Sequence, residues 1–143
     1  MNNEGKRQHF ILWADDDNDD FEIFREVLLH INYKYSIVEV ANGKEVFDYL
    51  HDKAADAYPC LIVLDMNMPV LSGRDTLAML KKHSNYKSIP VIVFTTSNSE
   101  LDKAFCRRYN TRMITKPPDY KQLQEVLPKL LSACNQAHGG KSA

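Results

Sequence analysis

The chain has 143 residues, of which 44% are hydrophobic and 26% charged, and its formal net charge is −1. This composition is typical of one globular domain that can bury a core, and it excludes disordered and membrane-spanning chains. The small net charge gives no reason to expect nucleic acid as a partner, and no apolar run has transmembrane length.

The ends of the chain and its cysteines favour a cytoplasmic protein. One domain is expected at residues 8–135, with flexible tails at 1–7 and 136–143, and the polar start lacks the apolar core of a signal peptide. The chain has three cysteines, Cys60, Cys106 and Cys134. They are too few and too far apart for a disulfide framework or a zinc site. We therefore expect reduced, structural thiols.

The first predicted strand is followed by a cluster of acids. Residues 10–14 form a short apolar run, and six acid or amide residues occupy positions 15–20. Apolar residues then recur at steps of three and four from Phe21 to Ile31, which predicts a helix. An acidic beginning suits the positive end of the helix dipole.

The acid cluster also raises a calcium-binding alternative. Asp15, Asp17, Asp19 and Glu26 stand at the first, third, fifth and twelfth positions of an EF-hand loop. The sixth position of such a loop needs glycine, however, and here it is Asp20. We therefore interpret Asp17, Asp19 and Asp20 as solvated residues of a helix start.

The middle of the chain alternates between strands and helices. Residues 37–41 predict a second strand, and Asn42 with Glu45 predicts a capping box at the next helix. The apolar run at 61–64 shows no alternation, which predicts a strand buried on both faces, as in a parallel sheet covered by helices. A third helix is expected to begin within residues 72–75.

The last third of the chain continues this alternation. Residues 89–94 predict a fourth strand, Ser99 begins a capping box for a fourth helix, and 113–115 predict a brief fifth strand. The last helix is expected to begin at residues 119–122. Pro128 lies within its buried stripe and is expected to kink or divide it.

Five alternations of strand and helix predict an α/β fold. Its parallel sheet would have right-handed crossovers and helices on both faces. Ligands of such sheets bind outside the carboxyl ends of the strands. Five polar residues fall at those ends: Asp15, Asp16, Asp65, Thr95 and Lys116. The sequence therefore predicts that they share one pocket.

The three acids of this pocket predict a metal site. Carboxylates held close together repel one another unless a cation intervenes, and an all-oxygen set favours Mg²⁺. Asp16 and Asp65 are expected to contact the metal directly, and Asp15 through a water molecule. The backbone carbonyl of Asn67 is expected to be a third protein ligand.

Phosphoryl chemistry assigns roles to the remaining residues. Asp65 would be the nucleophile that attacks a phosphoryl donor and becomes an acyl phosphate. The Lys116 ammonium would offset negative charge during transfer, and Thr95 would hydrogen-bond a phosphoryl oxygen. The Lys116–Pro117 peptide could be cis, aiming the lysine inward, or trans in a plain turn.

Four landmarks occur together in a specific order. They are the acid pair after the first strand, the turn Asp65-Met66-Asn67-Met68-Pro69 with Gly73 after it, Thr95, and Lys116-Pro117. Over residues 10–134 the chain thus resembles the receiver domain of bacterial two-component response regulators, of the stand-alone type. The resemblance implies a flavodoxin-like, doubly wound sheet of five parallel strands, in the order 2-1-3-4-5, with five helices.

The resemblance also implies a function in two-component signal transduction. A sensor histidine kinase would donate its phosphoryl group to Asp65 in a Mg²⁺-dependent step. The protein would promote only its own phosphorylation and dephosphorylation, and so would not be an enzyme.

Because the chain ends soon after the fifth helix, its output is expected to be a contact with a downstream protein. The face of helix four, strand five and helix five would make this contact and could also form a homodimer. Alternatively, the phosphoryl group passes to a histidine phosphotransfer protein.

One position departs from the family pattern. Many receivers carry Tyr or Phe three residues before the lysine, and here that residue is Met113. Methionine is flexible and apolar but lacks the hydrogen-bonding phenol. The usual coupling between Thr95 and an aromatic side chain is therefore left open.

Two other functions are compatible with the fold. A Mg²⁺-dependent aspartyl phosphatase would need a second catalytic acid two residues after the nucleophile, where Asn67 stands. A flavodoxin-like electron carrier would need hydroxyls and glycines for the FMN phosphate, where residues 15–20 are acids and amides. Both functions are less favoured than the receiver.

Overall fold

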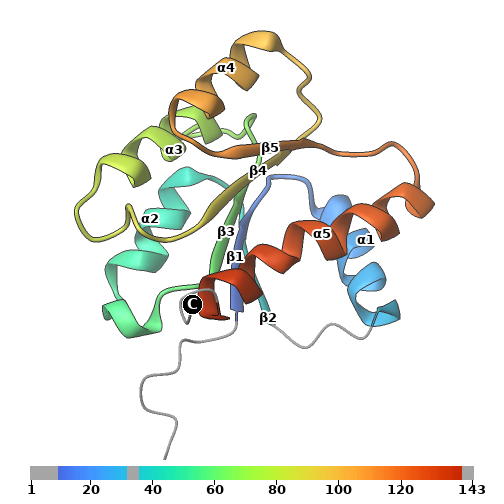
Figure 1. Cartoon of the computed structure of the whole chain (residues 1–143), viewed down its shortest axis with the longest axis horizontal. Helices are drawn as coiled ribbons and strands as arrows, with labels where there is room; N and C mark the ends of the chain where they lie inside the picture. Colours follow the sequence, from blue (N-terminus) through green and yellow to red (C-terminus); the bar gives the residue numbers. More distant parts are fainter. Residues whose placement is uncertain (1–9, 32–35, 140–143) are drawn as a thin grey trace, which may run out of the picture.

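The computed structural model describes residues 10–31 and 36–139. They form a five-stranded parallel sheet between two layers of helices (Figure 1). The strand order is β2-β1-β3-β4-β5, which confirms the expected order. The expected tail at residues 1–7 lies outside the described residues.

The elements alternate along the chain as predicted. The strands are β1 (Phe10–Ala14), β2 (Ser36–Val40), β3 (Leu61–Leu64), β4 (Val91–Thr95) and β5 (Arg112–Thr115). The α-helices are α1 (Asn18–His30), α2 (Gly43–His51), α3 (Gly73–Lys82), α4 (Glu100–Arg108) and α5 (Tyr120–Gly139), with a short 3-10 helix η1 at Ala55–Ala57. Within the described residues, no helix is both long enough and apolar enough to cross a bilayer.

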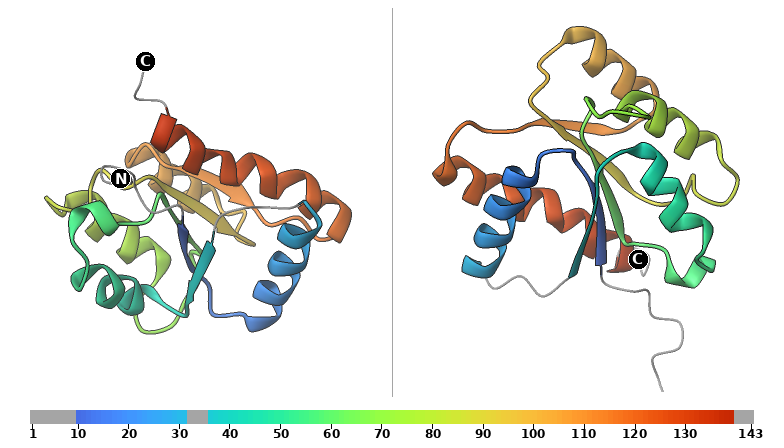
Figure 2. Two further views of the ribbon diagram at one scale, coloured as in Figure 1. Left: turned by 90° about the horizontal axis from the view of Figure 1, so that it is seen from below. Right: turned by 180° about the vertical axis from the view of Figure 1, so that it is seen from behind.

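The central strands β1, β3 and β4 are buried, and their successive side chains point alternately into the two helical layers. Ile11 and Trp13 of β1 pack into one core cluster with α1 and α5. Leu12 and Ala14 pack into a second cluster with α2, α3 and Cys106 of α4. Figure 2 shows the two helical layers on opposite sides of the sheet. Trp13 is a large core residue, and its ring stacks on Phe24 at 4.7 Å between centroids.

Capping side chains fix where the helices begin. Asp17 accepts from the backbone amides of Asp19 and Asp20 at the start of α1, Asn42 caps α2, and Ser72 and Ser99 cap α3 and α4. These interactions satisfy amides that have no partner within the helix. Because α1 begins at Asn18, inside the stretch that a calcium loop would need, the EF-hand alternative is excluded.

Helix α5 bears on two expectations. It runs from Tyr120 to Gly139 as one helix, so Pro128 does not divide it. Leu127 and Leu130 are fully buried on either side of the proline, and their packing on the sheet holds the helix where one backbone hydrogen bond is lost. Residues 136–139, expected to be part of a tail, are helical, and residues 140–143 lie outside the described residues.

The expectation of three reduced thiols is wrong for two of them. Cys60, just before β3, and Cys134, on α5, form a disulfide between residues whose Cα atoms are 5.0 Å apart. That separation is ordinary for a disulfide. The fold brings the two cysteines together across 74 positions of sequence. Cys106 is free and buried.

Candidate functional site

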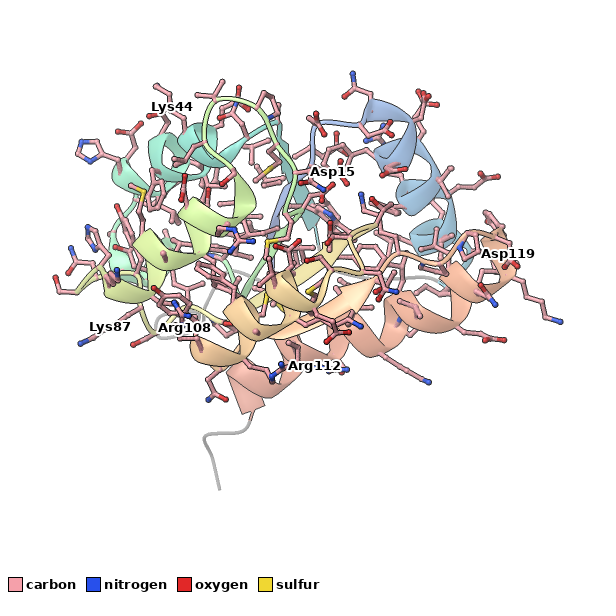
Figure 3. The ribbon with its side chains drawn as sticks, turned by 90° about the horizontal axis from the view of Figure 1, so that it is seen from above. Asp15, Lys44, Lys87, Arg108, Arg112 and Asp119 are labelled. Carbon is pink, nitrogen blue, oxygen red and sulfur yellow. A yellow bond between two sulfur atoms is a disulfide. The ribbon has the colours of Figure 1, made fainter. Side chains whose placement is uncertain are left out.

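The carboxyl ends of four strands meet at one edge of the sheet, where the predicted site residues lie. Asp15 follows β1, Asp65 follows β3, Thr95 ends β4 and Lys116 follows β5. Backbone hydrogen bonds fix these positions: the Asp65 amide donates to the Ala14 carbonyl (3.1 Å) and the Lys116 amide donates to the Thr95 carbonyl (2.8 Å). Figure 3 looks onto this edge, where Asp15 lies between α1 and the loop that leads to α3.

Three acids form a cluster at this edge. Asp15, Asp16 and Asp65 each offer a carboxylate oxygen within 4.8 Å of the others. Asp15 and Asp65 are buried, whereas Asp16 is exposed, so the cluster is open to solvent on one side. Oxygen donors at this spacing fit a divalent cation. The Asn67 amide donates to Asp65 Oδ1 (3.2 Å), which holds the following turn against the cluster, while the metal role of the Asn67 carbonyl stays a prediction.

The Asp65 carboxylate accepts hydrogen bonds from two further side chains. Thr95 donates its hydroxyl to Asp65 Oδ1 at 2.7 Å, and Lys116 Nζ donates to Asp65 Oδ2 at 3.1 Å. Gly73 lets the start of α3 press against this strand end, because a Cβ there would lie 2.0 Å from the Asp65 carbonyl oxygen. The acid, the hydroxyl and the amine that the sequence predicted therefore meet at Asp65.

Lys116 contacts one acid that sequence reasoning missed. Its Nζ donates to Asp15 Oδ2 (2.7 Å) and Asp65 Oδ2 (3.1 Å), and also to Asp20 Oδ2 (2.8 Å). Asp20 lies at the start of α1, as interpreted, but its carboxylate is partly shielded and pairs with Lys116. A signal was present, because Asp20 lies four residues before the buried Phe24 and so on the inward face of α1.

Burial and charge act against each other on the ionisable groups of the site. Burial raises the pKa of Asp15 to about 6, although the hydrogen bond and charge of Lys116 counteract the shift. Burial alone would lower the pKa of Lys116, but its hydrogen bonds to Asp15 and Asp20, and the charge of Asp65, raise it instead. The lysine therefore stays a cation among the acids.

The loop after Lys116 follows the plainer of the two alternatives. Among the described residues no peptide bond is cis, so Lys116–Pro117 is trans. The lysine reaches the acids from an ordinary turn between β5 and α5.

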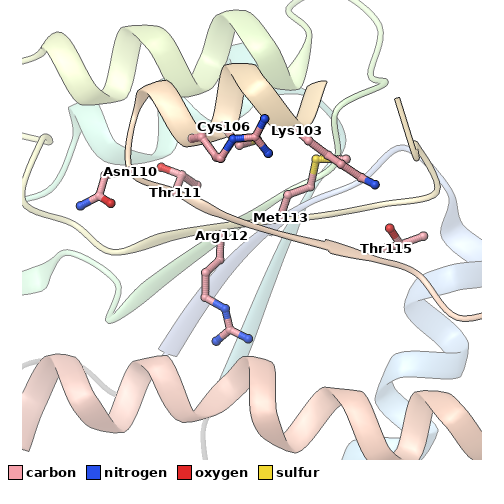
Figure 4. Close-up of a pocket in the computed structure, with 8 residues that line it drawn as sticks. Lys103, Cys106, Asn110, Thr111, Arg112, Met113 and Thr115 are labelled. Carbon is pink, nitrogen blue, oxygen red and sulfur yellow. The ribbon is translucent and has the colours of Figure 1, made fainter. Parts of the chain in front are cut away.

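A hollow lies beside β5, and none of the three clustered acids lines it. It is lined by Lys103, Cys106, Arg107, Asn110, Thr111, Arg112, Met113 and Thr115. Figure 4 shows that Met113 points from β5 towards α4, whereas Arg112 points towards α5. Met113 therefore takes the place where an aromatic residue was expected from the family pattern, and it packs partly buried against the core.

Comparison with known proteins agrees with the fold. The response regulator receiver domain family matches residues 11–128. Response regulator Rcp1 of Synechocystis sp. is 31% identical over 105 residues, which cover 71% of this chain and 71% of that protein. The crystal structure of the phosphorylated cyanobacterial phytochrome response regulator RcpA superposes with a TM-score of 0.78 at 29% identity, covering 87% of this chain and 92% of that one. The Mn²⁺-bound form of Rcp1 superposes with a TM-score of 0.76 at 28% identity over the same shares, 87% and 92%.

This chain belongs to the response regulator receiver family. Receivers are signalling domains of two-component systems, and they interact with histidine kinases and downstream targets. The acidic cluster is compatible with phosphorylation and with a divalent metal.

Proposed function

We propose that this protein accepts a phosphoryl group from a sensor histidine kinase on Asp65, in a Mg²⁺-dependent step, and thereby switches a protein-binding surface. The observation that carries the proposal is the surroundings of Asp65. Its oxygens face a cluster of acids, a lysine and a hydroxyl, and the exposed Asp16 leaves the cluster open to solvent. A carboxylate that only capped a turn would need none of these partners.

Three carboxylates and one carbonyl would hold the metal. Asp15, Asp16 and Asp65, with the backbone carbonyl of Asn67, are all oxygen donors, which suits Mg²⁺. A bound Mg²⁺ would neutralise charge on the phosphoryl oxygens during transfer. The Mn²⁺-bound structure of the relative Rcp1 supports a divalent cation at such a site.

The chain's own residues carry the transfer. An Asp65 oxygen attacks the phosphorus atom, the bond from phosphorus to the kinase histidine nitrogen breaks, and the imidazole leaves with the bond's electron pair. Lys116 and Thr95 now contact the Asp65 oxygens, so the same groups are placed to contact the phosphoryl oxygens of the acyl phosphate. In this role the protein promotes only its own phosphorylation and dephosphorylation and is not an enzyme.

The output surface in this proposal is the face made by α4, β5 and α5. The hollow beside Met113 lies on it, with three basic side chains among its lining residues: Lys103, Arg107 and Arg112. A downstream protein or a histidine phosphotransfer protein would bind there, and a homodimer could use the same face. The proposal takes residues 8–135 as the receiver unit and places the protein in the cytoplasm, where a kinase has ATP as its phosphoryl source.

Replacement of the acceptor tests the proposal. Asp65→Asn should take up no phosphoryl group from acetyl phosphate with Mg²⁺, because an amide is a poor nucleophile, while the unchanged protein becomes labelled. Intact-protein mass spectrometry measures the label. Asp75→Asn, at an exposed acid of α3, is the matched control and should be labelled normally. Persistent labelling of a folded Asp65→Asn variant, or no labelling of the unchanged protein, would reject Asp65 as the acceptor.

A further inference from the structure

We propose that Asp20 is a positioning residue of the site: its carboxylate holds the Lys116 ammonium in place while Asp65 changes from a free carboxylate to an acyl phosphate. The inference rests on the proposed function, because it gives Asp20 a part in the same reaction. Asp20 is not one of the three acids, Asp15, Asp16 and Asp65, that form the acidic cluster.

The geometry of Lys116 carries the first step of the argument. A lysine ammonium has three hydrogen-bond donors and no acceptor. Its three acceptors are Asp15 at 2.7 Å, Asp20 at 2.8 Å and Asp65 at 3.1 Å. The Lys116 side chain is only 9% exposed, so a donor without a partner would be costly to the site. Asp20 therefore completes the set of acceptors.

The second step is that these three acids will not stay equivalent during the reaction. Asp65 takes the phosphorus, so its contact with Lys116 is exchanged for one with a phosphoryl oxygen. Asp15 belongs to the acid cluster and would share its charge with the cation. Among the three acceptors of Lys116, Asp20 alone neither takes phosphorus nor lies in that cluster. The contact between Asp20 and Lys116 therefore stays the same throughout the reaction, and it keeps the ammonium group directed towards Asp65.

The third step is that α1 itself holds Asp20 in position. The Asp20 backbone amide donates to Asp17 Oδ1 at 3.4 Å, within the first turn of the helix. The Asp20 side chain is 27% exposed, and together with Lys116 it lines a hollow between α1 and the start of α5. Asp19 lies next to it on the same turn but is exposed, and its carboxylate is not among the Lys116 contacts.

Asp19 therefore supplies a matched control. Asp20→Ala and Asp19→Ala each remove one negative charge from the first turn of α1, with a similar effect on the helix dipole. We expect Asp20→Ala to slow labelling by acetyl phosphate, at saturating Mg²⁺, by about threefold to tenfold, which corresponds to about 0.7–1.4 kcal/mol. Asp20→Asn keeps an oxygen acceptor and should lie between the two. Asp19→Ala should stay within about twofold of the unchanged protein.

A double-mutant cycle separates positioning from a structural role. In a Lys116→Met background, Asp20→Ala should have no further effect on the labelling rate, because the contact is already lost. Equal slowing in both backgrounds would mean that Asp20 only supports the fold, and this result would overturn the proposal.

A second readout does not depend on phosphorylation. Without phosphoryl donor, a small amine-acylating reagent should modify Lys116 several times faster in Asp20→Ala than in Asp19→Ala or the unchanged protein, as measured by peptide mass spectrometry. Equal reactivity of Lys116 in all three proteins would contradict the contact between Asp20 and Lys116. If Lys116 reactivity rises as expected but the unchanged protein takes up no phosphoryl group, the proposed function fails while the contact stands. If labelling is normal in Asp20→Ala, only the role of Asp20 fails.

Discussion

Val70, in the loop between β3 and α3, has a backbone conformation that β-branched residues rarely adopt. Its φ is 67°, and the residue is 76% exposed. The Leu71 amide donates to the Pro69 carbonyl at 2.7 Å, which closes a tight three-residue turn around Val70. A left-handed conformation costs an ordinary residue roughly 1–2 kcal/mol. The turn leads from Asp65 to the cap of α3, so strain is stored beside the site.

Replacing this valine should relieve the strain. Val70→Gly should raise the free energy of unfolding by about 0.5–1 kcal/mol, because glycine accepts a positive φ, although it loses more entropy on folding. Urea unfolding measures the change. Asn110, with a φ of 55°, is the control position. Asparagine tolerates this conformation, so Asn110→Gly should change stability by only a few tenths of a kcal/mol. A loss of stability in Val70→Gly would contradict the assignment of strain.

Asp20 shows what can be predicted at the scale of residues. The pocket residues at the strand ends follow from the order of strands, because a parallel sheet gathers those ends at one edge. A lysine that reaches from β5 to the first turn of α1 depends on side-chain length and on how α1 packs. The sequence places Asp20 on the inward face of the helix, but it does not say which group lies opposite.

At the scale of elements, α3 and α4 are joined by a polar network that reaches the site. The Arg74 guanidinium pairs with the Asp102 carboxylate and lies 4.7 Å from the centre of the Phe105 ring. The Ser97 hydroxyl donates to Asp102 at 2.6 Å, and the Ser97 amide donates to the Thr95 hydroxyl at 3.3 Å. A continuous series of contacts thus connects Thr95 to α4. This connection does not involve Met113, which stands at the position of the family's aromatic residue.

Breaking this network should loosen α4. Asp102→Ala should speed amide hydrogen exchange in α4 by about threefold to tenfold, because the Asp102 side chain is 14% exposed and its ion pair is partly shielded from solvent. Mass spectrometry of peptides from α4 measures the exchange. Glu100, on the same turn, is 83% exposed where it pairs with Lys103. Glu100→Ala should therefore have less than a twofold effect, and equal effects in the two variants would contradict a special role for Asp102.

The sequence predicted the order of the helices and strands and the capped helix starts, but not every strand boundary. Capping residues such as Asn42 and Ser99 act locally, so the helix starts that they fix could be recognised from spacing alone. The effect of Pro128 depends on the packing of α5 against the sheet, which no local pattern contains. β4 begins at Val91, two residues later than expected, after Pro90, whose carbonyl accepts from the Ile62 amide at 2.9 Å. A proline has no amide hydrogen to donate to the ladder.

At the scale of the whole molecule, the Cys60–Cys134 disulfide closes a loop that spans 74 positions of the 143-residue chain. A loop of this size reduces the entropy of the unfolded chain, and such bonds typically add about 2–4 kcal/mol of stability. The sequence did not predict the bond because it depends on where α5 lies on the sheet. A thiol reductant would open the bond and leave both residues as thiols. The Cys60 sulfur then has an acceptor nearby, since it lies 3.3 Å from the Phe10 carbonyl oxygen.

Reduction should therefore change stability without unfolding the protein. A thiol reductant should lower the melting temperature by roughly 5–15 °C, as measured by circular dichroism. The double variant Cys60→Ala, Cys134→Ala should melt at the same temperature with and without reductant. Cys106→Ala removes the free buried cysteine and should keep the response to reductant. A response in the double variant would assign the effect to something other than this bond.

The disulfide also anchors one end of α5 more firmly than the other. It pins the helix to the sheet near its last turns, whereas Tyr120, at the first turn, follows directly on the loop that carries Lys116. If that loop shifts on phosphorylation, we expect the displacement of α5 to be largest at Tyr120 and smallest near Cys134, where the bond anchors the helix. Opening the bond would remove this covalent anchor, so we expect reduction of these two cysteines, remote from the acids, to increase how far α5 can move when Asp65 is modified.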